Sequence, residues 1–258
     1  MFSDPVYLHH KAHLIVRYAV ADSTNLRLKA DADQYPDGTV IMADEQTNGR
    51  GRMDRRWLSR SGAGAWFSYL FKPSFAFPAM NTPGFVFVAA LAAANALILM
   101  TGADIQIKWP NDLVFNGKKL CGIMCEMKTR DTELDHAVIG IGINLSGSDF
   151  PDDLPYAASV ESETGIKISP ERMITAFLDE FDKVSHRFLK YGLKEILNSI
   201  APISATLGKK VTAVSDSGII TGIATGFLDD GALLIDDGSD THVFRAGDVS
   251  VRGVMGYT

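Results

Sequence analysis

Two polar clusters in this chain combine residue types that bind anions. One runs through Gly49-Arg50-Gly51-Arg52 and continues to Arg55 and Trp57, and the other is Lys108-Trp109-Pro110-Asn111-Asp112, followed by Lys118-Lys119. Glycine lets the backbone approach a ligand closely, and the arginine fork binds carboxylate or phosphate oxygens two at a time. The formal net charge is −6, so these cations are concentrated locally. Together the clusters predict a site for a ligand that carries several negative charges.

Each cluster alone is a weak signal, since glycine-arginine runs also occur in RNA-binding tracts and in ordinary loops. Here, however, five motifs follow one another in the order and spacing of biotin–protein ligases, and the sequence resembles that family over almost its whole length. The motifs are Asp22-Ser23-Thr24-Asn25, Gly49-Arg50-Gly51-Arg52 with Trp57, Lys108-Trp109-Pro110-Asn111-Asp112-Leu113, Lys119-Leu120 with Gly122-Ile123, and Gly140-Ile141-Gly142-Ile143-Asn144. The resemblance is to the short form of the ligase, which lacks an N-terminal DNA-binding domain.

The resemblance implies an enzyme that works in two steps. The carboxylate of biotin attacks the α-phosphate of ATP, which gives biotinyl-5′-AMP and pyrophosphate, and a specific lysine of a biotin carboxyl carrier protein domain then takes the biotin. Neither step needs a covalent enzyme intermediate. Because two anions must be brought together, the reaction needs positioning and positive charge. Mg²⁺ is expected to accompany ATP, since it neutralises phosphate charge.

The resemblance also assigns roles to individual residues. Lys119 is expected to hold the biotin carboxylate and the α-phosphate, Arg52 to bridge the same two groups, and Arg50 to line the loop that closes over them. Asp112 is expected near the metal or the incoming amine, with a turn residue after proline as the alternative. The expected catalytic set is therefore Lys119, Arg52, Asp112 and Lys108, and Asp112 is the candidate Mg²⁺ ligand.

Biotin needs a few polar contacts for its ureido ring and an apolar wall. The residues that the resemblance places around biotin are Ser23, Thr24, Asn25, Gln46, Arg50, Gly51, Arg52, Trp57, Lys119, Gly122 and Met124. The residues that it places around ATP are Arg52, Arg55, Lys108, Asn111 and Asn144. For Arg55 the alternative is a solvated loop, and Arg252 is a further candidate for the nucleotide.

The glycine-arginine segment departs from the family pattern. Met53 and Asp54 stand where the commoner form has Arg-Gly. Loss of that glycine is expected to stiffen the loop, and Asp54 adds negative charge beside a phosphate site, which puts tight retention of the adenylate in question. Cys121 replaces a small residue and is expected to be tolerated.

Other functions stay open at this point. A lipoate- or octanoate-type acyl-protein ligase fits less well, because the glycine-arginine and Lys-Trp-Pro-Asn-Asp motifs are typical of the biotin type. A non-catalytic biotin binder is a further alternative. A DNA-binding repressor is not expected, because only about a dozen residues precede the first predicted strand, too few for a helix-turn-helix module. The sequence pI near 5.5 also argues against general nucleic-acid binding.

The composition is that of a globular protein, with 46% hydrophobic and 22% charged residues. Cys121 and Cys125 are too few for a disulfide scaffold and are expected to be buried thiols. No signal-peptide pattern opens the chain, so a cytoplasmic location is expected. The apolar run 85–100 is short for a membrane span and contains Asn95, so a buried helix is predicted. A homodimer is neither predicted nor excluded.

The strands and helices that must position these motifs predict a fold that contains both, of the α/β class (α+β type). Strands are predicted over 14–20, 39–43, 66–71, 105–109, 112–115, 119–126 and 137–144, with helices that begin at Asn25, span 83–100 and follow Ser169. Asn116-Gly117 predicts a tight hairpin that would bring Lys119 beside Asp112. The resemblance implies that the strands form a mixed sheet backed by helices, the class II synthetase-like catalytic fold.

After Pro202 the pattern changes to short β-like runs at 211–214, 218–225, 232–235 and 242–245, separated by turns rich in Asp, Gly and Ser. The resemblance identifies this part with a C-terminal SH3-like β-barrel. The expected domains are 1–202, which would bind biotin and ATP, and 203–258. His9, His10 and His13 are expected on a mobile terminus, and the segment 47–56 is expected to become ordered when ligand binds.

Overall fold

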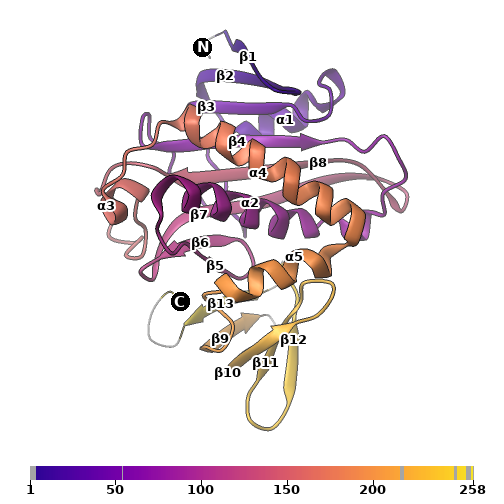
Figure 1. Cartoon of the computed structure of the whole chain (residues 1–258), viewed down its shortest axis with the longest axis vertical. Helices are drawn as coiled ribbons and strands as arrows, with labels where there is room; N and C mark the ends of the chain where they lie inside the picture. The colour runs from indigo at the N-terminus through magenta and orange to yellow at the C-terminus, as the bar shows by residue number, and fades with distance from the viewer. Residues whose placement is uncertain (1–3, 54, 216–217, 247–248, 254–256, 258) are drawn as a thin grey trace.

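The protein folds around one large sheet, with a smaller sheet at its C-terminal end (Figure 1). The computed structural model describes residues 4–53, 55–215, 218–246, 249–253 and 257. The large sheet has eight strands in the order β1-β2-β3-β4-β8-β7-β6-β5. These strands are β1 (Val6–His10), β2 (His13–Ala21), β3 (Val40–Gln46), β4 (Gly64–Phe71), β5 (Gln106–Lys108), β6 (Asp112–Phe115), β7 (Lys118–Arg130) and β8 (Glu133–Asn144).

The large sheet is mixed, as expected. Strands β2 and β3 run parallel, and every other neighbouring pair is antiparallel. The connection between β6 and β7 is the tight turn at Asn116-Gly117, where both residues have positive φ, the backbone that such a two-residue hairpin requires. The predicted hairpin is confirmed: it pairs Phe115 with Lys118 and Val114 with Lys119, and a register shift between Leu113 and Val114 then pairs Asp112 with Gly122.

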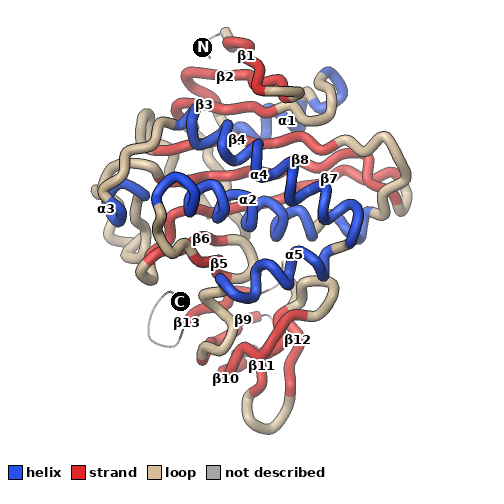
Figure 2. Tube along the Cα trace, in the orientation of Figure 1, coloured by secondary structure: helices blue, strands red, loops and turns tan. Residues whose placement is uncertain are grey.

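Helices cover both faces of the large sheet (Figures 1 and 2). They are α1 (Thr24–Ala30), α2 (Gly84–Thr101), α3 (Val160–Thr164), α4 (Pro170–Tyr191) and α5 (Leu193–Ile200). Successive strand residues point to opposite faces: Val40 joins the core under α2 and α4, whereas Ile41 joins a smaller core with Leu28 of α1. The helix α1, which carries the first motif, therefore lies on the face opposite α2 and α4.

The two long helices behave as their sequences predict. Helix α4 buries the whole stripe Ile174, Phe177, Phe181, Val184 and Phe188, and Ser169 caps it by accepting a hydrogen bond from the backbone N–H of Arg172. Among the described residues, the segment Ala79–Thr101 is long and apolar enough to cross a membrane, but 67% of its most apolar window is buried. That burial is typical of the core helix of a globular fold.

The small sheet is antiparallel and has the order β12-β11-β10-β9-β13. Its strands are β9 (Lys210–Ser215), β10 (Gly218–Phe227), β11 (Leu233–Asp236), β12 (Thr241–Phe244) and β13 (Val249–Gly253). The large part holds it through Trp109, whose backbone N–H donates to Thr206 Oγ1 at 3.0 Å and whose indole N–H donates to the Gly231 carbonyl at 2.9 Å. The peptide bond from Trp109 to Pro110 is cis.

The expectation of a mobile N-terminal segment is wrong. Residues 6–10 form β1, which pairs with β2 at the edge of the large sheet. His10 Nε2 lies 2.7 Å from Asp179 of α4, and the buried ring of His13 lies 3.1 Å from Asp182 and 3.0 Å from the Gly38 carbonyl. These contacts fix the hairpin to α4, which a reading of the isolated segment could not reveal. Strand β1, helices α3 and α5 and strand β13 were not predicted from the sequence.

Candidate active site

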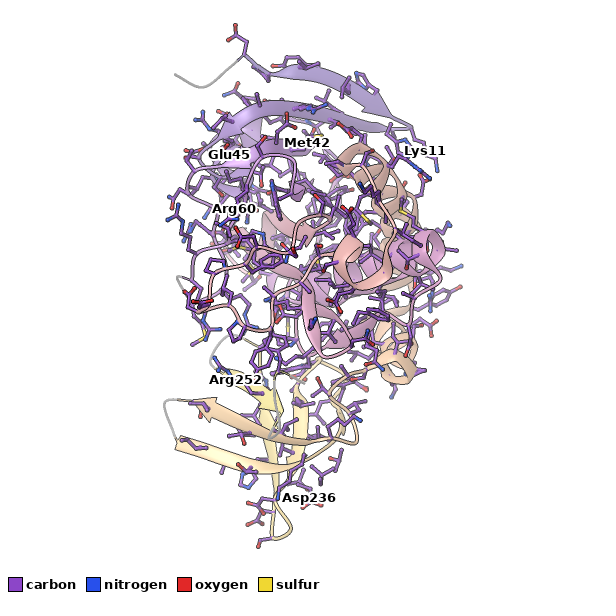
Figure 3. All side chains as sticks on the ribbon, turned by 90° about the vertical axis from the view of Figure 1, so that its left-hand side faces the viewer. Lys11, Met42, Glu45, Arg60, Asp236 and Arg252 are labelled. Carbon is purple, nitrogen blue, oxygen red and sulfur yellow. The ribbon has the colours of Figure 1, made fainter. Side chains whose placement is uncertain are left out.

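One cavity of about 390 Å³ opens between the ends of the large-sheet strands and the small sheet. It is lined by all sixteen residues that the family resemblance assigns to catalysis, biotin or ATP: Ser23, Thr24, Asn25, Gln46, Arg50, Gly51, Arg52, Arg55, Trp57, Lys108, Asn111, Asp112, Lys119, Gly122, Met124 and Asn144. Arg252 also lines the cavity. Figure 3 shows Arg252 where the small sheet meets the large part, with Asp236 at the far end of the small sheet.

The glycine-arginine segment forms a narrow loop over the cavity. The Trp57 N–H donates to the Gly49 carbonyl at 2.9 Å, and the Gly51 N–H donates to the Arg55 carbonyl at 2.7 Å. A side chain at Gly49 would place its Cβ 2.4 Å from the Trp57 carbonyl oxygen, so the close approach of the two sides of this loop requires glycine. Met53 has φ 56°, a left-handed backbone that disfavours a long side chain. Asp54 lies outside the described residues.

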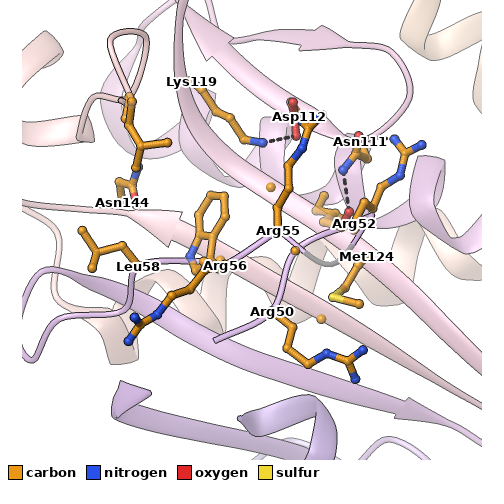
Figure 4. A pocket seen from close by; sticks show the side chains of 18 of the residues that line it. Arg50, Arg52, Arg55, Arg56, Leu58, Asn111, Asp112, Lys119, Met124 and Asn144 are labelled. Carbon is orange, nitrogen blue, oxygen red and sulfur yellow. Dashed lines mark hydrogen bonds and ion pairs between the residues drawn. The ribbon is translucent and has the colours of Figure 1, made fainter. Parts of the chain in front are cut away.

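Arg52 is fixed toward the interior by the Lys-Trp-Pro-Asn-Asp segment. Its Nη1 donates to Asn111 Oδ1 at 2.9 Å, and the Asn111 amide in turn donates to the Ile123 carbonyl at 2.8 Å (Figure 4). Figure 4 also shows Arg55 extending toward Asp112 from the same loop. The polar side chains of the loop therefore lie next to those of the Lys-Trp-Pro-Asn-Asp segment in the cavity.

Asp112 and Lys119 form the ion pair that the hairpin predicted, with Lys119 Nζ 2.6 Å from Asp112 Oδ1. Burial alone would raise the pKa of Asp112, but the ammonium groups of Lys119 and Lys108 and the hydrogen bonds to the carboxylate outweigh it, so the pKa lies below its usual range. The other oxygen, Oδ2, accepts a hydrogen bond from the Tyr257 hydroxyl. The carboxylate is thus ionised and held at both oxygens.

Lys108 is the most deeply buried cation of the site, with 6% of its surface exposed. Its Nζ donates to the Val251 carbonyl at 2.9 Å and lies 4.0 Å from the centre of the Tyr257 ring. Burial lowers its pKa to about 8, against the opposing attraction of Asp112 and with further lowering by the neighbouring cations. Lys108 therefore loses its charge at mildly alkaline pH.

The opposite end of the cavity carries short polar side chains joined by hydrogen bonds. Gln46 Oε1 accepts from the Thr24 N–H at 2.8 Å, while its amide nitrogen donates to Ser59 Oγ at 2.7 Å. The buried Ser68 hydroxyl lies 2.7 Å from Thr24 Oγ1 and also contacts Asn25 Oδ1. These groups are held in fixed orientations before any ligand arrives, which favours selective binding of a polar ring.

Glu126 of β7 ties this end to the glycine-arginine loop. It accepts hydrogen bonds from Asn25 Nδ2 at 3.0 Å and from Lys29 Nζ at 2.6 Å, and Arg50 Nη1 lies 3.8 Å from it. Burial raises the pKa of Glu126, but these partners outweigh that effect and the net pKa is lowered. The carboxylate therefore stays charged and orients Asn25.

The Trp57 indole forms an apolar wall against two glycines of the sheet. A Cβ at Gly142 would lie 2.4 Å from Trp57 Nε1, and one at Gly122 would lie 2.8 Å from Trp57 Cζ3. Lys119 Nζ lies 5.2 Å from the centre of the Trp57 ring. In the part of the chain that the structure describes, the indole N–H is buried and has no hydrogen-bond partner. The Gly140-x-Gly142 motif thus leaves room for side chains, since a Cβ at Gly140 would meet Asn25 Oδ1 at 2.2 Å.

The segment 154–158 closes the side of the cavity next to β7. The Lys119 N–H donates to the Tyr156 carbonyl at 2.6 Å, and the Ala158 N–H donates to the Lys119 carbonyl at 3.0 Å. Asn144, at the end of β8, donates through its amide to the Ala158 carbonyl at 3.0 Å. Asn144 therefore anchors this segment, a role that its motif did not indicate.

The described residues offer no group of three or more His, Cys, Asp or Glu side chains that could hold a metal ion. Asp112 is the buried carboxylate of the cavity, and both its oxygens already have partners. This donor set does not form a protein cage for an ion. It does suit Mg²⁺ that arrives on phosphates, because such an ion takes only one or two carboxylates and keeps phosphate and water ligands.

Several residues of the site were missed by sequence reasoning: Ser68, Glu126, Tyr156 and Tyr257. Ser68 and Glu126 lie within strands and hold the lining residues Thr24 and Asn25 from behind, and in the sequence such a polar strand residue looks like any solvent-facing one. Tyr257 reaches Asp112 across 145 positions of sequence. No local pattern marks such a contact.

Comparison with known proteins matches both parts of the chain. The family model described as "Biotin/lipoate A/B protein ligase family" matches residues 18–144, and that of the "Biotin protein ligase C terminal domain" matches residues 206–252. The biotin–[acetyl-CoA-carboxylase] ligase of Paracoccus denitrificans is 32% identical over 241 residues, which are 91% of this chain and 99% of that protein. The bifunctional ligase/repressor BirA of Bacillus subtilis is 32% identical over 93% of this chain and 74% of its own length.

A solved structure shares the fold over nearly the whole chain. The biotin protein ligase from Aquifex aeolicus, solved in complex with biotin and ATP, superposes with a TM-score of 0.80 at 29% identity and covers 93% of this chain and 98% of its own. The mixed sheet, the C-terminal sheet and the order of the motifs all agree with this likeness. The chain belongs to the biotin protein ligase family.

Proposed function

We propose that this protein activates biotin with ATP to form biotinyl-5′-AMP and then transfers the biotin to a lysine of an acceptor protein. The observation that carries the proposal is one cavity with two chemically different ends. Short, mutually hydrogen-bonded polar side chains form one end. Cations form the other, around the ion pair of Lys119 and Asp112.

In the first step a biotin carboxylate oxygen forms a bond to the α-phosphorus of ATP. The bond from that phosphorus to the bridging oxygen of the β-phosphate breaks, and pyrophosphate leaves. Lys119 and Arg52 lie where they can hold the two anionic reactants together, because fixed positive charge lowers the repulsion between them. Arg55, Lys108, Asn111 and Asn144 are assigned to the nucleotide, and Mg²⁺ accompanies its phosphates.

The polar end is assigned to the ureido ring of biotin. Ser23, Thr24, Asn25 and Gln46 supply donors and acceptors; Thr24 and Gln46 are held by their hydrogen bonds to each other, and Ser68 holds Thr24 and Asn25. Trp57, Gly122 and Met124 supply the wall beside the apolar part of biotin, and Arg50 with Gly51 covers it from the loop. The chemistry of the two ends thus matches the two ends of the biotin molecule.

In the second step the acceptor amine attacks the acyl carbon of the adenylate. A carbon–nitrogen bond forms, the bond from the acyl carbon to the AMP oxygen breaks, AMP leaves, and the amine releases a proton to water. A carboxylate with a lowered pKa is a weak base, so we assign Asp112 to holding Lys119 and not to accepting that proton.

The test is ATP–pyrophosphate exchange with purified protein, run with biotin and separately with lipoate. Exchange that depends on biotin is expected. Exchange with lipoate alone would move the protein to the acyl-protein ligases that the same family model includes. Absence of exchange with either acid, together with measurable biotin binding by calorimetry, would indicate a non-catalytic binder and refute the proposal.

We assign residues 1–202 to the catalytic part and 203–258 to an SH3-like part that assists it. A biotin carboxyl carrier domain is the proposed acceptor, and transfer of labelled biotin to a purified carrier domain, absent when its acceptor lysine is replaced by arginine, tests this. A cytoplasmic location is proposed because ATP is the substrate and Cys121 and Cys125 are free thiols.

A further inference from the structure

Tyr257 belongs to none of the motifs, yet it contacts three groups of the cation end. Its hydroxyl donates to Asp112 Oδ2. Its ring lies 4.0 Å from Lys108 Nζ and 5.6 Å from the ring of Tyr156, tilted by 31°. A residue far along the chain is thus packed among the charged groups on which the proposed chemistry depends.

The phenol is the donor in its contact with Asp112. Burial raises the pKa of Tyr257 above its usual value, and the negative charge of Asp112 and the hydrogen bond to it raise it further. A hydrogen bond from a neutral donor to a carboxylate belongs to the stronger, charge-assisted class.

This hydrogen bond completes the restraint on the Asp112 carboxylate. A carboxylate held at a single oxygen can rotate about its Cβ–Cγ bond and carry its partner with it. Here Lys119 holds Oδ1 at 2.6 Å and Tyr257 holds Oδ2, so both oxygens have fixed partners. The Lys119 ammonium, whose side chain is 25% exposed, is consequently held at one place on the cavity wall.

We propose that Tyr257 is a positioning residue for adenylate formation, which fixes Asp112 and through it holds Lys119 where the biotin carboxylate and the α-phosphate meet. The proposal rests on the function proposed above. The hydroxyl and the ring have separable parts in it: the hydroxyl orients Asp112, whereas the ring covers Lys108.

Tyr257→Phe tests the hydroxyl, because it keeps the ring against Lys108 and Tyr156. The expected result is a kcat for biotin-dependent exchange that falls roughly tenfold, in line with the loss of a hydrogen bond to a charged group, with the KM for biotin changed less than twofold. The second readout needs no activity: isotope-edited NMR of the Asp112 carboxyl carbon should show its pKa rising when the phenol hydrogen bond is lost.

The matched control is Tyr191→Phe. Tyr191 is an exposed tyrosine of α4, also with an ammonium over its ring, that of Lys190 at 4.9 Å, and it is not among the residues that line the cavity. Its substitution should change neither readout. A general effect of removing a tyrosine hydroxyl is thereby separated from an effect at Asp112.

Three results would overturn the proposal. A higher kcat or a lower KM for ATP in Tyr257→Phe would show that the tyrosine obstructs the nucleotide. An unchanged kcat with an unchanged pKa of Asp112 would show that the hydrogen bond orients nothing. A pKa shift without any change in kcat would show that the contact is structural only. Absence of exchange in the wild type would refute the proposed function itself, whatever the Asp112 titration gives.

Discussion

Replacing Lys119 by methionine should damage both activity and stability, for reasons that can be separated. Methionine keeps the length and apolar stem of the side chain but removes the charge that faces Asp112 at 2.6 Å. Without that cation the two anionic reactants repel each other, and we expect exchange to fall roughly 10²–10³-fold, as when one preorganised electrostatic contact is removed.

The stability loss follows from the carboxylate that is left behind. Breaking a buried ion pair costs about 3–5 kcal/mol. Because Lys119 is 25% exposed and because Lys108 and Tyr257 still face Asp112, we expect about 2 kcal/mol in the free energy of unfolding at pH 7.

The pH dependence gives the sign of the effect. In the wild type the lowered pKa of Asp112 contributes stability above the unfolded-state pKa of about 4 and loses it as the pH falls through the folded-state value. In Lys119→Met the burial that remains raises the pKa of Asp112. The free energy of unfolding of the variant is therefore lowered at neutral pH, and it recovers as the carboxyl becomes protonated. The difference between the two proteins should therefore shrink from pH 7 toward pH 4.

Urea unfolding followed by tryptophan fluorescence at several pH values measures this difference. The control is the double variant Lys119→Met with Asp112→Asn, which removes the stranded charge. It should recover stability to within about 1 kcal/mol of the wild type, as expected when a buried pair is replaced by neutral groups, and should recover no exchange activity. A Lys119→Met protein as stable as the wild type, with a difference independent of pH, would refute the reasoning.

Three further results are expected. The kcat/KM for ATP should fall as the pH rises through about 8, because the Lys108 pKa lies there and deprotonation removes its charge; Lys108→Arg should abolish this alkaline limb, whatever its absolute rate. Gly142→Ala, whose Cβ would lie 2.4 Å from Trp57 Nε1, should weaken biotin binding more than tenfold by calorimetry, whereas Gly226→Ala, with its nearest neighbour at 3.9 Å, should not. Trypsin should cleave the segment 47–56 more slowly when biotin and ATP are present, and equal cleavage would contradict ordering by ligand.

The parts of the site that local chemistry encodes could be predicted from the sequence. The Asn116-Gly117 turn pairs Lys119 with Val114 and so brings the Lys119 side chain within reach of Asp112, two residues away. The order of the motifs predicted that the remaining candidates share one site, and they line one cavity. The buried face of α4 could also be predicted, because apolar residues that recur with a period of 3.6 residues lie on one side of a helix.

The parts that depend on distant packing could not be predicted. Strand β1 has four exposed residues out of five, so its sequence carries no core pattern, and it is held by pairing with β2 and by contacts such as His10 with Asp179. The burial of Lys108 depends on Val251 and Tyr257, which the chain supplies more than a hundred positions later. Propensity and spacing describe neither kind of contact.

The way in which the Lys-Trp-Pro-Asn-Asp segment joins the two sheets has a practical consequence for anyone who wants a smaller ligase. The backbone N–H and indole N–H of Trp109 and the Nζ of Lys108 all donate to atoms between Thr206 and Val251. A version cut after residue 202 would strand three donors next to the cavity, at about 1–3 kcal/mol for each one left buried. The small sheet therefore cannot be removed without loss to the large part. A shortened enzyme would need replacement acceptors for these three donors before its catalytic residues could be expected to keep their positions.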